Sequence, residues 1–383
     1  MSSLANQKPK DLFLLEGISL VAFNKDFTQV ALSKKDNLIY IYSVPDLMKT
    51  DKWKLLYTLD SHYQYVSGLD WCHATNRILS CSYDKTSFVW EFTDNKWMPS
   101  NVVATTKLGY LCCKWNKRGD KFCEGTSEKK LFIGYFCKYN INEKKEKVKV
   151  DWWMGKNIKA HKSSVVTCEI DPTSLFVLSG STDLRIYVSS CYIPEVDDQF
   201  LTEQTKPLAQ EFGQVIFEFK PNCWINSVAW LPSGSLGIVA GQDATISVIN
   251  HQESKYDLIS CKHAPVTQII PIDDKSFYAV CYDRNILLYE QKDDSWEVKK
   301  TITGKDTGDS KPKTDSKPKT TIGGNVSKSI AMFEQKGNIK KENLAVATKS
   351  AAHLHQSLIS SVNIKGKDMI TTDLSGFVKY WKL

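Results

Sequence analysis

Three aspartates in this sequence each follow a histidine at nearly the same distance, a pairing that could transfer protons. The pairs, 22, 22 and 20 residues apart, are His62 with Asp84, His161 with Asp183, and His263 with Asp283. A carboxylate beside an imidazole is a common general-base arrangement in enzymes. A catalytic pair is expected once in a chain, whereas this pair recurs. The recurrence therefore favours a structural role in a repeated unit.

The elements that would position such a pair are visible around Asp84. The stretch NRILSCSYDKTSFVWEF, residues 76–92, places this aspartate among turn-forming residues between two apolar runs, which predicts a β-hairpin. In a tight turn, a carboxylate accepts hydrogen bonds from turn amides and from a nearby imidazole. We expect Ser80 and Trp90 to complete a buried hydrogen-bonded set with His62 and Asp84.

The spacing around Asp84 is repeated along the chain. Val66 and Trp71 lie 18 and 13 residues before it, and Trp90 lies 6 after it. Similar spacing fits six other reference positions, which are Asp36, Glu128, Asp183, Asp243, Asp283 and, more weakly, Ser375. Most intervals suit one propeller blade, which needs about 40 to 50 residues. Because a single small sheet cannot bury both faces, the blades must stack, and the sequence predicts an all-β, seven-bladed β-propeller.

Ring closure is the next expectation. The chain stops at FVKYWKL, after the third strand of the seventh blade, so that blade lacks an outer strand. The segment Leu12–Leu15 precedes the first blade. We expect it to pair beside Phe377–Trp381 and join the two ends of one domain spanning residues 1–383.

Composition narrows the class of protein. The chain has 383 residues, 42% hydrophobic content and a net charge of +7, with eleven cysteines and no CxxC pair. Scattered cysteines within apolar runs indicate a reduced, intracellular protein, and no signal peptide or membrane span is predicted. The modest charge and the lack of a basic helix disfavour nucleic acid as a partner. No phosphate loop, nucleophile motif or cofactor site is recognised.

The interval before the last reference position is 92 residues, about twice the expected length. Residues 301–350 carry a net charge of +5 and contain DSKPKT twice, which predicts a flexible basic insertion. Within it, residues 328–336 are predicted to form a short helix with Ile330 and Phe333 on one face and Met332 alongside. Such a helix is marginal alone, so it either contacts a partner, folds onto the propeller or does not form.

Other candidates for chemistry are weaker. His353 and His355 could suggest a metal pair, but no third ligand is near, and we interpret them as surface or loop histidines. The run KKEKVK at 144–149 could bind phosphate or an acidic peptide, although a solvated hairpin extension between Phe136 and Trp152 is favoured. Cys112-Cys113 lies where an inner strand is expected, which favours packing over catalysis.

Several motifs resemble one known family. They are VAFNKDFTQVA (21–31), HYQYVSGLDW (62–71), NRILSCSYDKTSFVWEF (76–92), CCKWNKRGDKFCEGTSEKKLFIGYF (112–136), DWWMGKNIKAHKSSV (151–165) and YIPEVD (192–197). Together they are similar to the WD-repeat subunit 1 of the actin-related protein 2/3 complex. The resemblance covers essentially all blades in order. NKDFTQ, DWW followed by IKAHKSSV, and YIPEVD lie outside the generic repeat pattern.

The resemblance implies a non-enzymatic WD-repeat subunit in the cytoplasm and actin cytoskeleton. The implied partners are the other subunits of the complex, actin-related proteins, the actin filament and acidic nucleation-promoting peptides. It also implies that the insertion helix reaches a filament, with Phe333 as the matching residue. Two alternatives remain, a general WD-repeat adaptor or substrate receptor in another assembly, and a propeller enzyme whose site is at the central channel.

Overall fold

The computed structural model describes residues 10–13, 17–104, 106–141, 147–293, 295–302, 355 and 357–383. All of these except Ile302 belong to one compact unit, formed by Lys10–Thr301 and His355–Leu383. The insertion expected at 301–350 lies outside the described residues apart from its first two. The same is true of the predicted helix at 328–336, with Ile330, Met332 and Phe333.

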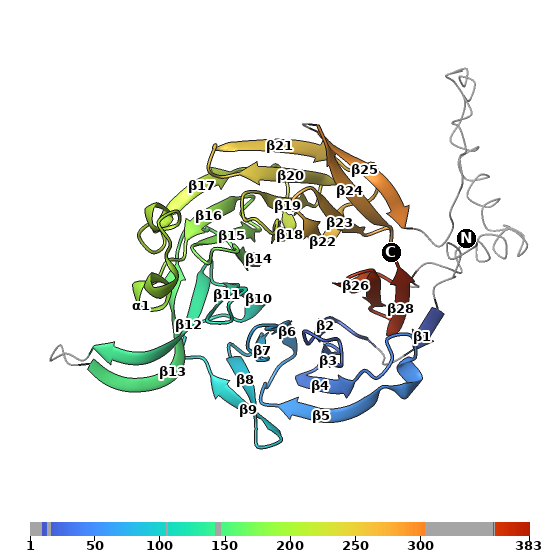
Figure 1. Ribbon diagram of the computed structural model, residues 1–383, viewed down its shortest axis with the longest axis horizontal. Helices are drawn as coiled ribbons and strands as arrows, with labels where there is room; N and C mark the ends of the chain where they lie inside the picture. Colours follow the sequence, from blue (N-terminus) through green and yellow to red (C-terminus); the bar gives the residue numbers. More distant parts are fainter. Residues whose placement is uncertain are drawn as a thin grey trace, which may run out of the picture. The chain divides into compact units, whose positions relative to one another are not determined.

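Seven four-stranded antiparallel sheets surround a central axis in this unit, as Figure 1 shows, and they confirm the predicted seven-bladed propeller. The first three sheets contain β2 (Leu20–Phe23), β3 (Gln29–Ser33), β4 (Leu38–Ser43) and β5 (Lys54–Asp60); β6 (Val66–Trp71), β7 (Ile78–Ser82), β8 (Ser87–Thr93) and β9 (Lys96–Asn101); and β10 (Tyr110–Trp115), β11 (Lys121–Thr126), β12 (Leu131–Ile141) and β13 (Lys147–Ile158). In each sheet, the first strand in this order lies innermost (Figure 1).

The next three sheets contain β14 (Val165–Ile170), β15 (Phe176–Ser181), β16 (Ile186–Ser190) and β17 (Val215–Phe219); β18 (Ile225–Trp230), β19 (Gly237–Gly241), β20 (Thr245–Asn250) and β21 (Lys255–Ser260); and β22 (Val266–Asp273), β23 (Ser276–Cys281), β24 (Ile286–Lys292) and β25 (Ser295–Ile302). The described helical elements are short, namely α1 (Pro194–Asp197), η1 (Thr50–Lys52), η2 (Asp198–Phe200) and η3 (Lys206–Leu208).

The seventh sheet joins residues from both ends of the sequence. It contains β26 (Ile359–Lys365), β27 (Asp368–Asp373) and β28 (Phe377–Lys382), with β1 (Lys10–Phe13) as its outer strand. β1 runs antiparallel to β28, with Lys10 opposite Tyr380 and Phe13 opposite Phe377. The closing strand thus starts two residues before the expected segment Leu12–Leu15, whose last two residues lie outside the described part.

The core lies between neighbouring sheets rather than inside any one of them. One cluster joins Ile39 and Ile41 of the first sheet to Trp71 and Trp90 of the second. Second strands such as β7 and β15 are buried along their whole length, because each of their faces is covered by an adjacent blade. A strand buried on both faces shows no apolar–polar alternation, and β7 (ILSCS) and β15 (FVLSGS) combine apolar residues with buried serines.

The turn between the second and third strands has a common backbone form. In six sheets, the residue after the reference position has a positive φ; these residues are Lys85, Lys129, Leu184, Ala244, Arg284 and Gly376. A left-handed conformation costs energy for any residue other than glycine. Hydrogen bonds to the preceding polar side chain therefore stabilise a strained turn.

This turn and the loop entering the first strand of the same sheet lie at one end of the propeller, because the strands alternate in direction. The backbone amides of Ser127 and Gln242 donate across the two loops to the carbonyls of Gly109 and Trp224, at 3.0 and 2.8 Å. We call this end the corner face. The loops joining first to second strands and third to fourth strands form the opposite face.

The third sheet carries an extended hairpin. β12 and β13 pair as far as Ile141 opposite Lys147, and the hairpin reaches beyond the neighbouring outer strands (Figure 1). Lys147–Lys149, the end of the KKEKVK run, lie in β13, while residues 142–146 lie outside the described part. This agrees with a hairpin extension between Phe136 and Trp152.

Candidate functional site

The Asp84 carboxylate lies in the turn between β7 and β8, on the corner face. It accepts two backbone hydrogen bonds, from the amide of Thr86 to Oδ1 at 2.7 Å and from the amide of Tyr63 to Oδ2 at 2.6 Å. Burial raises the pKa of Asp84, but the hydrogen bonds from Thr86 and Tyr63 outweigh it and hold the pKa below its ordinary value. The ionised carboxylate therefore joins the turn to the entering loop.

His62 connects this corner to the interior of the sheet. Its Nδ1 atom lies 2.8 Å from Thr86 Oγ1 and 3.4 Å from Asp84 Oδ2, and its Nε2 atom lies 2.8 Å from Ser80 Oγ. The indole of Trp90 donates to the same Ser80 hydroxyl at 2.8 Å. The four side chains expected from the sequence thus form one buried chain of contacts. Burial lowers the pKa of His62 despite the facing carboxylate.

The fourth sheet repeats this arrangement. His161 lies 3.3 Å from Asp183 Oδ2 through Nδ1 and 2.8 Å from Ser179 Oγ through Nε2. The amide of Lys162 donates to Asp183 Oδ2 at 2.6 Å, the same contact that Tyr63 makes in the second sheet. Ser189 occupies the place of Trp90, so no indole joins this network, and the Ser179 hydroxyl donates to the Tyr187 carbonyl at 3.5 Å.

The sixth sheet has a more open version of the pair. His263 Nδ1 lies 3.2 Å from Asp283 Oδ2, and both side chains are about one third exposed, at 33% each. The amide of Asn285 donates to Asp283 Oδ1 at 3.1 Å. The acid therefore fixes its own turn here, as in the other blades, while its imidazole partner is less enclosed.

Asp243 and Glu128 hold their corners without an imidazole. Asp243 accepts from the amide and the hydroxyl of Thr245, at 3.1 and 2.6 Å. Glu128 accepts from the amide of Lys107 at 2.8 Å, a residue 21 positions earlier, as Tyr63 is to Asp84. Holding the corner therefore depends on the acid rather than on the histidine.

The seventh sheet corrects two sequence interpretations. His355, interpreted as a surface or loop histidine, is buried with Nδ1 at 2.9 Å from Asp373 Oδ2 and Nε2 at 2.6 Å from Thr371 Oγ1. Trp381 donates to the same threonine hydroxyl at 2.9 Å. Ser375 has the expected position, but the carboxylate comes from Asp373, two residues earlier. The missed signal was the 20-residue interval from His355 to Ser375, equal to that from His263 to Asp283. His353 lies outside the described residues.

These corners have the chemistry of structural clamps. In the second, fourth and seventh sheets both imidazole nitrogens contact side chains of the same blade, which leaves no ring atom directed at a substrate. Within the described ranges, no group of three or more histidine, cysteine, aspartate or glutamate side chains could hold a metal ion. No helix in that part of the chain is both long and apolar enough to cross a membrane.

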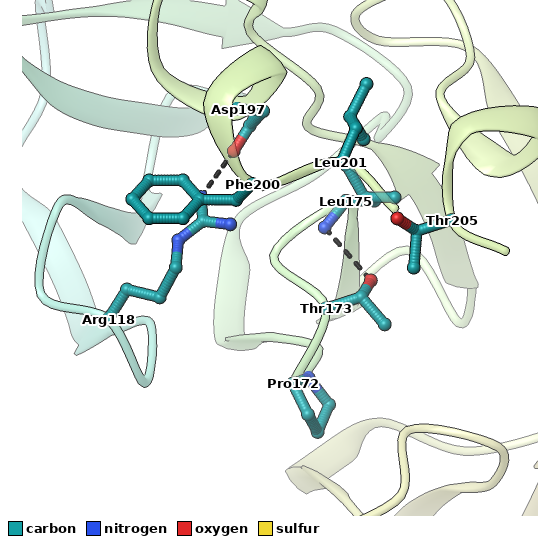
Figure 2. Close-up of a pocket in the computed structure, with 8 residues that line it drawn as sticks. All are labelled: Arg118, Pro172, Thr173, Leu175, Asp197, Phe200, Leu201 and Thr205. Atoms are coloured by element: carbon teal, nitrogen blue, oxygen red, sulfur yellow. Dashed lines mark hydrogen bonds and ion pairs between the residues drawn. The ribbon is translucent and has the colours of Figure 1, made fainter. Parts of the chain in front are cut away.

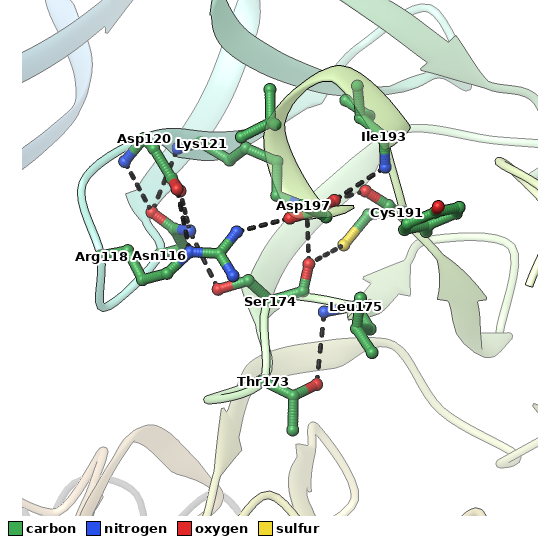
Figure 3. A network of polar contacts seen from close by, with 12 residues as sticks. Asn116, Arg118, Asp120, Lys121, Thr173, Ser174, Leu175, Cys191, Ile193 and Asp197 are labelled. Atoms are coloured by element: carbon green, nitrogen blue, oxygen red, sulfur yellow. Dashed lines mark hydrogen bonds and ion pairs between the residues drawn. The ribbon is translucent and has the colours of Figure 1, made fainter. Parts of the chain in front are cut away.

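A second polar cluster lies on the opposite face, between the third and fourth sheets (Figure 3). Lys121 and Asp197 are both 0% exposed, and Lys121 Nζ lies 2.6 Å from Asp197 Oδ2. The same ammonium donates to the carbonyls of Ser174 and Cys191, at 2.6 and 3.0 Å, and Arg118 binds the other carboxylate oxygen. A buried ion pair needs such additional hydrogen bonds to offset its desolvation.

The cluster holds in place the YIPEVD segment (192–197), for which the sequence analysis predicted no structure. Asp197 ends α1 and accepts from the amide of Ile193 at 2.7 Å, so the YIPEVD motif is folded around its last residue. The guanidinium of Arg118 stacks 4.4 Å from the ring centre of Phe200, beside a pocket of about 230 Å³ (Figure 2). A buried lysine in a strand gave no sequence signal, because its partner lies 76 residues away.

Exposed aromatic side chains occur on the corner face. Tyr63 is 89% exposed and Trp224 is 60% exposed, and both lie in loops that enter a first strand. Trp224 and Tyr282 line an open depression of about 450 Å³, together with uncharged residues such as Asn226 and Thr267. Large exposed aromatics are typical of surfaces that contact other molecules.

The sheet order and the repeated acid–imidazole corners define the class of this protein as a WD-repeat β-propeller. The profile of the family "WD domain, G-beta repeat" matches residues 53–91, 153–188 and 213–250. These ranges include the Asp84 and Asp183 corners and the turn of Asp243.

Comparison with curated proteins identifies more specific relatives. The chain is 29% identical over 278 residues to actin-related protein 2/3 complex subunit 1A-A of Xenopus laevis, covering 71% of this chain and 70% of the relative. It is 26% identical over 383 residues to subunit 1A of Arabidopsis thaliana, covering 96% and 94%. It is 23% identical over 357 residues to subunit 1 of Schizosaccharomyces pombe, covering 89% and 88%. These relatives confirm the resemblance indicated by the sequence motifs.

Proposed function

We propose that this chain is the propeller subunit of an actin-related protein 2/3 complex and that it serves as a scaffold without catalytic activity. The observation that carries the proposal is the match over 96% of the chain to relatives named as subunit 1 of that complex. A match of this extent includes loops and outer strands, where a generic propeller has no reason to be similar.

The geometry supports a scaffold rather than an enzyme. The side chains of the buried acid–imidazole pairs contact each other within their own blades, and Lys121 and Asp197 contact each other between two sheets. Seven stacked sheets supply a rigid body with two loop faces and an outer rim, which suits several protein partners at once. On this proposal the chain works in the cytoplasm, within the actin cytoskeleton.

Co-purification tests this function. The tagged full-length chain is expressed in cells of its source organism, and the proteins that co-purify are identified by mass spectrometry. We expect both actin-related proteins and the small subunits of the complex in near-equal amounts. Recovery of a different stable assembly would favour the alternative, a general WD-repeat adaptor, and a chain recovered alone would contradict the proposal.

The filament contact is a finer part of the proposal and rests on the family resemblance. We assign it to Ile330, Met332 and Phe333, which lie outside the described residues. Replacing both Ile330 and Phe333 by alanine should reduce filament-side binding and branch formation while the complex still assembles. The matched control is Thr314→Ala in the first DSKPKT repeat. Unchanged branching by the double variant would remove this assignment.

Binding of acidic activator peptides is the last part of the proposal. The purified complex should bind a labelled acidic peptide, and affinity should fall as salt rises, because exposed charges are screened. A matched peptide with its acids replaced by amides serves as the control. Equal binding of the two peptides would contradict this part while leaving the scaffold role intact.

A further inference from the structure

Two adjacent cysteines in β10 take part in different cores. Successive side chains of a strand point to opposite faces of its sheet. Cys113 packs into the core shared with the second sheet, which also contains Cys81. Cys112 packs against the core shared with the fourth sheet, which contains Cys123 and Cys168. Each cysteine of the pair therefore meets cysteines of a different group.

The contact of Cys112 with Cys168 is close. Their Sγ atoms are 3.6 Å apart, although the residues are 56 positions apart and belong to the innermost strands of adjacent sheets, β10 and β14. Gly125 is the strand partner of Cys112, and a Cβ atom there would lie 2.7 Å from Cys112 Sγ and 2.3 Å from the Val165 carbonyl oxygen. The glycine therefore leaves room for the thiol at the joint between the sheets.

The two thiols differ in accessibility and in acidity. Cys112 is partly exposed, whereas Cys168 is buried. The hydrogen bond between the two thiols lowers the pKa of Cys112 and raises that of Cys168. Because the thiolate is the reactive form of cysteine, Cys112 is the sulfur that meets an oxidant first.

We propose that Cys112 and Cys168 are an oxidisable pair, which closes a disulfide between the third and fourth sheets when the protein meets hydrogen peroxide. The Cys112 thiolate attacks one peroxide oxygen, the O–O bond breaks, and Cys112 becomes a sulfenic acid. The leaving hydroxide takes up the proton that the Cys112 thiol had released, which gives the first water. The Cys168 sulfur then attacks the Cys112 sulfur, the S–O bond breaks, and the hydroxyl leaves with the Cys168 proton as the second water. Two thiols are oxidised and one peroxide is reduced to two waters.

The geometry requires only a local movement. The sulfurs must approach from 3.6 Å to a bond length of about 2.05 Å, by rotation of the side chains and a small shift between the strands. The inference does not depend on the proposed function, since it concerns the joint between two blades of a single chain.

The test is a cross-link analysis of the full-length chain. The reduced protein is treated with hydrogen peroxide, its free thiols are blocked with N-ethylmaleimide, and it is digested with trypsin without reduction. We expect a disulfide between the peptides 108–114 and 163–185, which contain Cys112–Cys113 and Cys168. The cross-link should be about tenfold or more above that in the chain oxidised in guanidinium, because folding holds the thiols together. Dithiothreitol should remove it.

Serine variants assign the sulfurs. Cys112→Ser and Cys168→Ser should each abolish the cross-link, whereas Cys113→Ser, which changes the neighbouring residue in the same peptide, should retain it. Circular dichroism of the reduced variants checks that each is folded. The proposal fails if the native chain keeps both thiols free after oxidation, if the cross-link is no more abundant than in guanidinium, or if it follows Cys113 instead.

Discussion

The corner carboxylates stabilise this protein at the scale of single residues. Asp84 accepts hydrogen bonds from two amides that belong to different loops, so one side chain fixes both a turn and its neighbour. The next residue, Lys85, has a φ of 73°. The carboxylate therefore offsets a strained backbone conformation with charge-assisted hydrogen bonds.

Replacing Asp84 by asparagine should lower the free energy of unfolding by about 1 to 3 kcal/mol, since an amide offers one acceptor oxygen where the carboxylate offers two. Chemical denaturation at pH 7 measures the loss. The matched control is Asp243→Asn, because Asp243 is exposed and accepts its hydrogen bonds from Thr245 within its own turn. Equal losses in the two variants would contradict a special role for the buried corner.

His251 predicts a pH dependence. It is buried between Phe176 and Trp230, and within the described structure neither ring nitrogen has a hydrogen-bond partner. Burial lowers the pKa of His251 below its unfolded value of about 6.5, against a smaller opposing effect of Asp171. Below pH 6.5 the unfolded chain therefore binds a proton that the folded chain does not, and stability falls as pH falls.

The expected slope is up to about 1.4 kcal/mol per pH unit from this one group. His251→Phe should lose less stability than the wild type between pH 6.5 and 5, as measured by denaturant unfolding at each pH. His73→Gln is the control, because His73 is exposed. Parallel pH profiles for wild type and His251→Phe would show that another group dominates.

At the scale of elements, the joint between the third and fourth sheets is held by Lys121 and Asp197. Replacing Asp197 by asparagine would leave the buried ammonium without its counter-charge, at a cost of roughly 3 to 5 kcal/mol. Asp198→Asn alters the adjacent carboxylate on η2, which is exposed and accepts a hydrogen bond from the hydroxyl of the half-buried Tyr192. Thermal unfolding should show a large decrease for the first variant and little change for the second.

A second variant separates charge from packing. Combining Asp197→Asn with Lys121→Met removes both buried charges, so it should recover much of the stability lost in the single variant. If the double variant is as unstable as Asp197→Asn alone, the cost arises from α1 and its hydrogen bonds rather than from an unpaired ammonium.

The elements also show what sequence could and could not predict. The hairpins and the seven corners follow from local spacing, since each reference position and its flanking strands lie within about 25 residues. Lys121 and Asp197 could not be paired in this way, because a charge buried between two blades is recognisable only once the blades are placed. Asp373 was missed because it lies two residues before Ser375, the expected position, and yet its carboxylate contacts His355. A fixed residue spacing does not detect an acid that lies two positions away from the expected one.

At the scale of the whole molecule, the pairing of β1 with β28 joins the two most distant strands in the sequence and closes the ring. Without β1, strand β28 would become an exposed edge, which can pair with other chains. A chain lacking residues 1–13 should therefore unfold at a lower temperature and aggregate more than a chain lacking residues 1–9, which retains Lys10–Phe13. Light scattering and thermal unfolding of both truncations measure this. Identical behaviour would mean that β1 adds nothing to the closed ring.

The pairing of Lys10 with Tyr380 also sets an order of events during synthesis. A ribosome adding about 5 to 20 residues per second needs roughly 20 to 70 seconds between these two positions. Throughout that time the first strand of the nascent polypeptide has no partner in its final sheet, while six other blades can already assemble behind it. Completion of the ring therefore waits until Phe377–Tyr380 have been synthesised, and until then β1 has an unpaired edge that can pair with other chains.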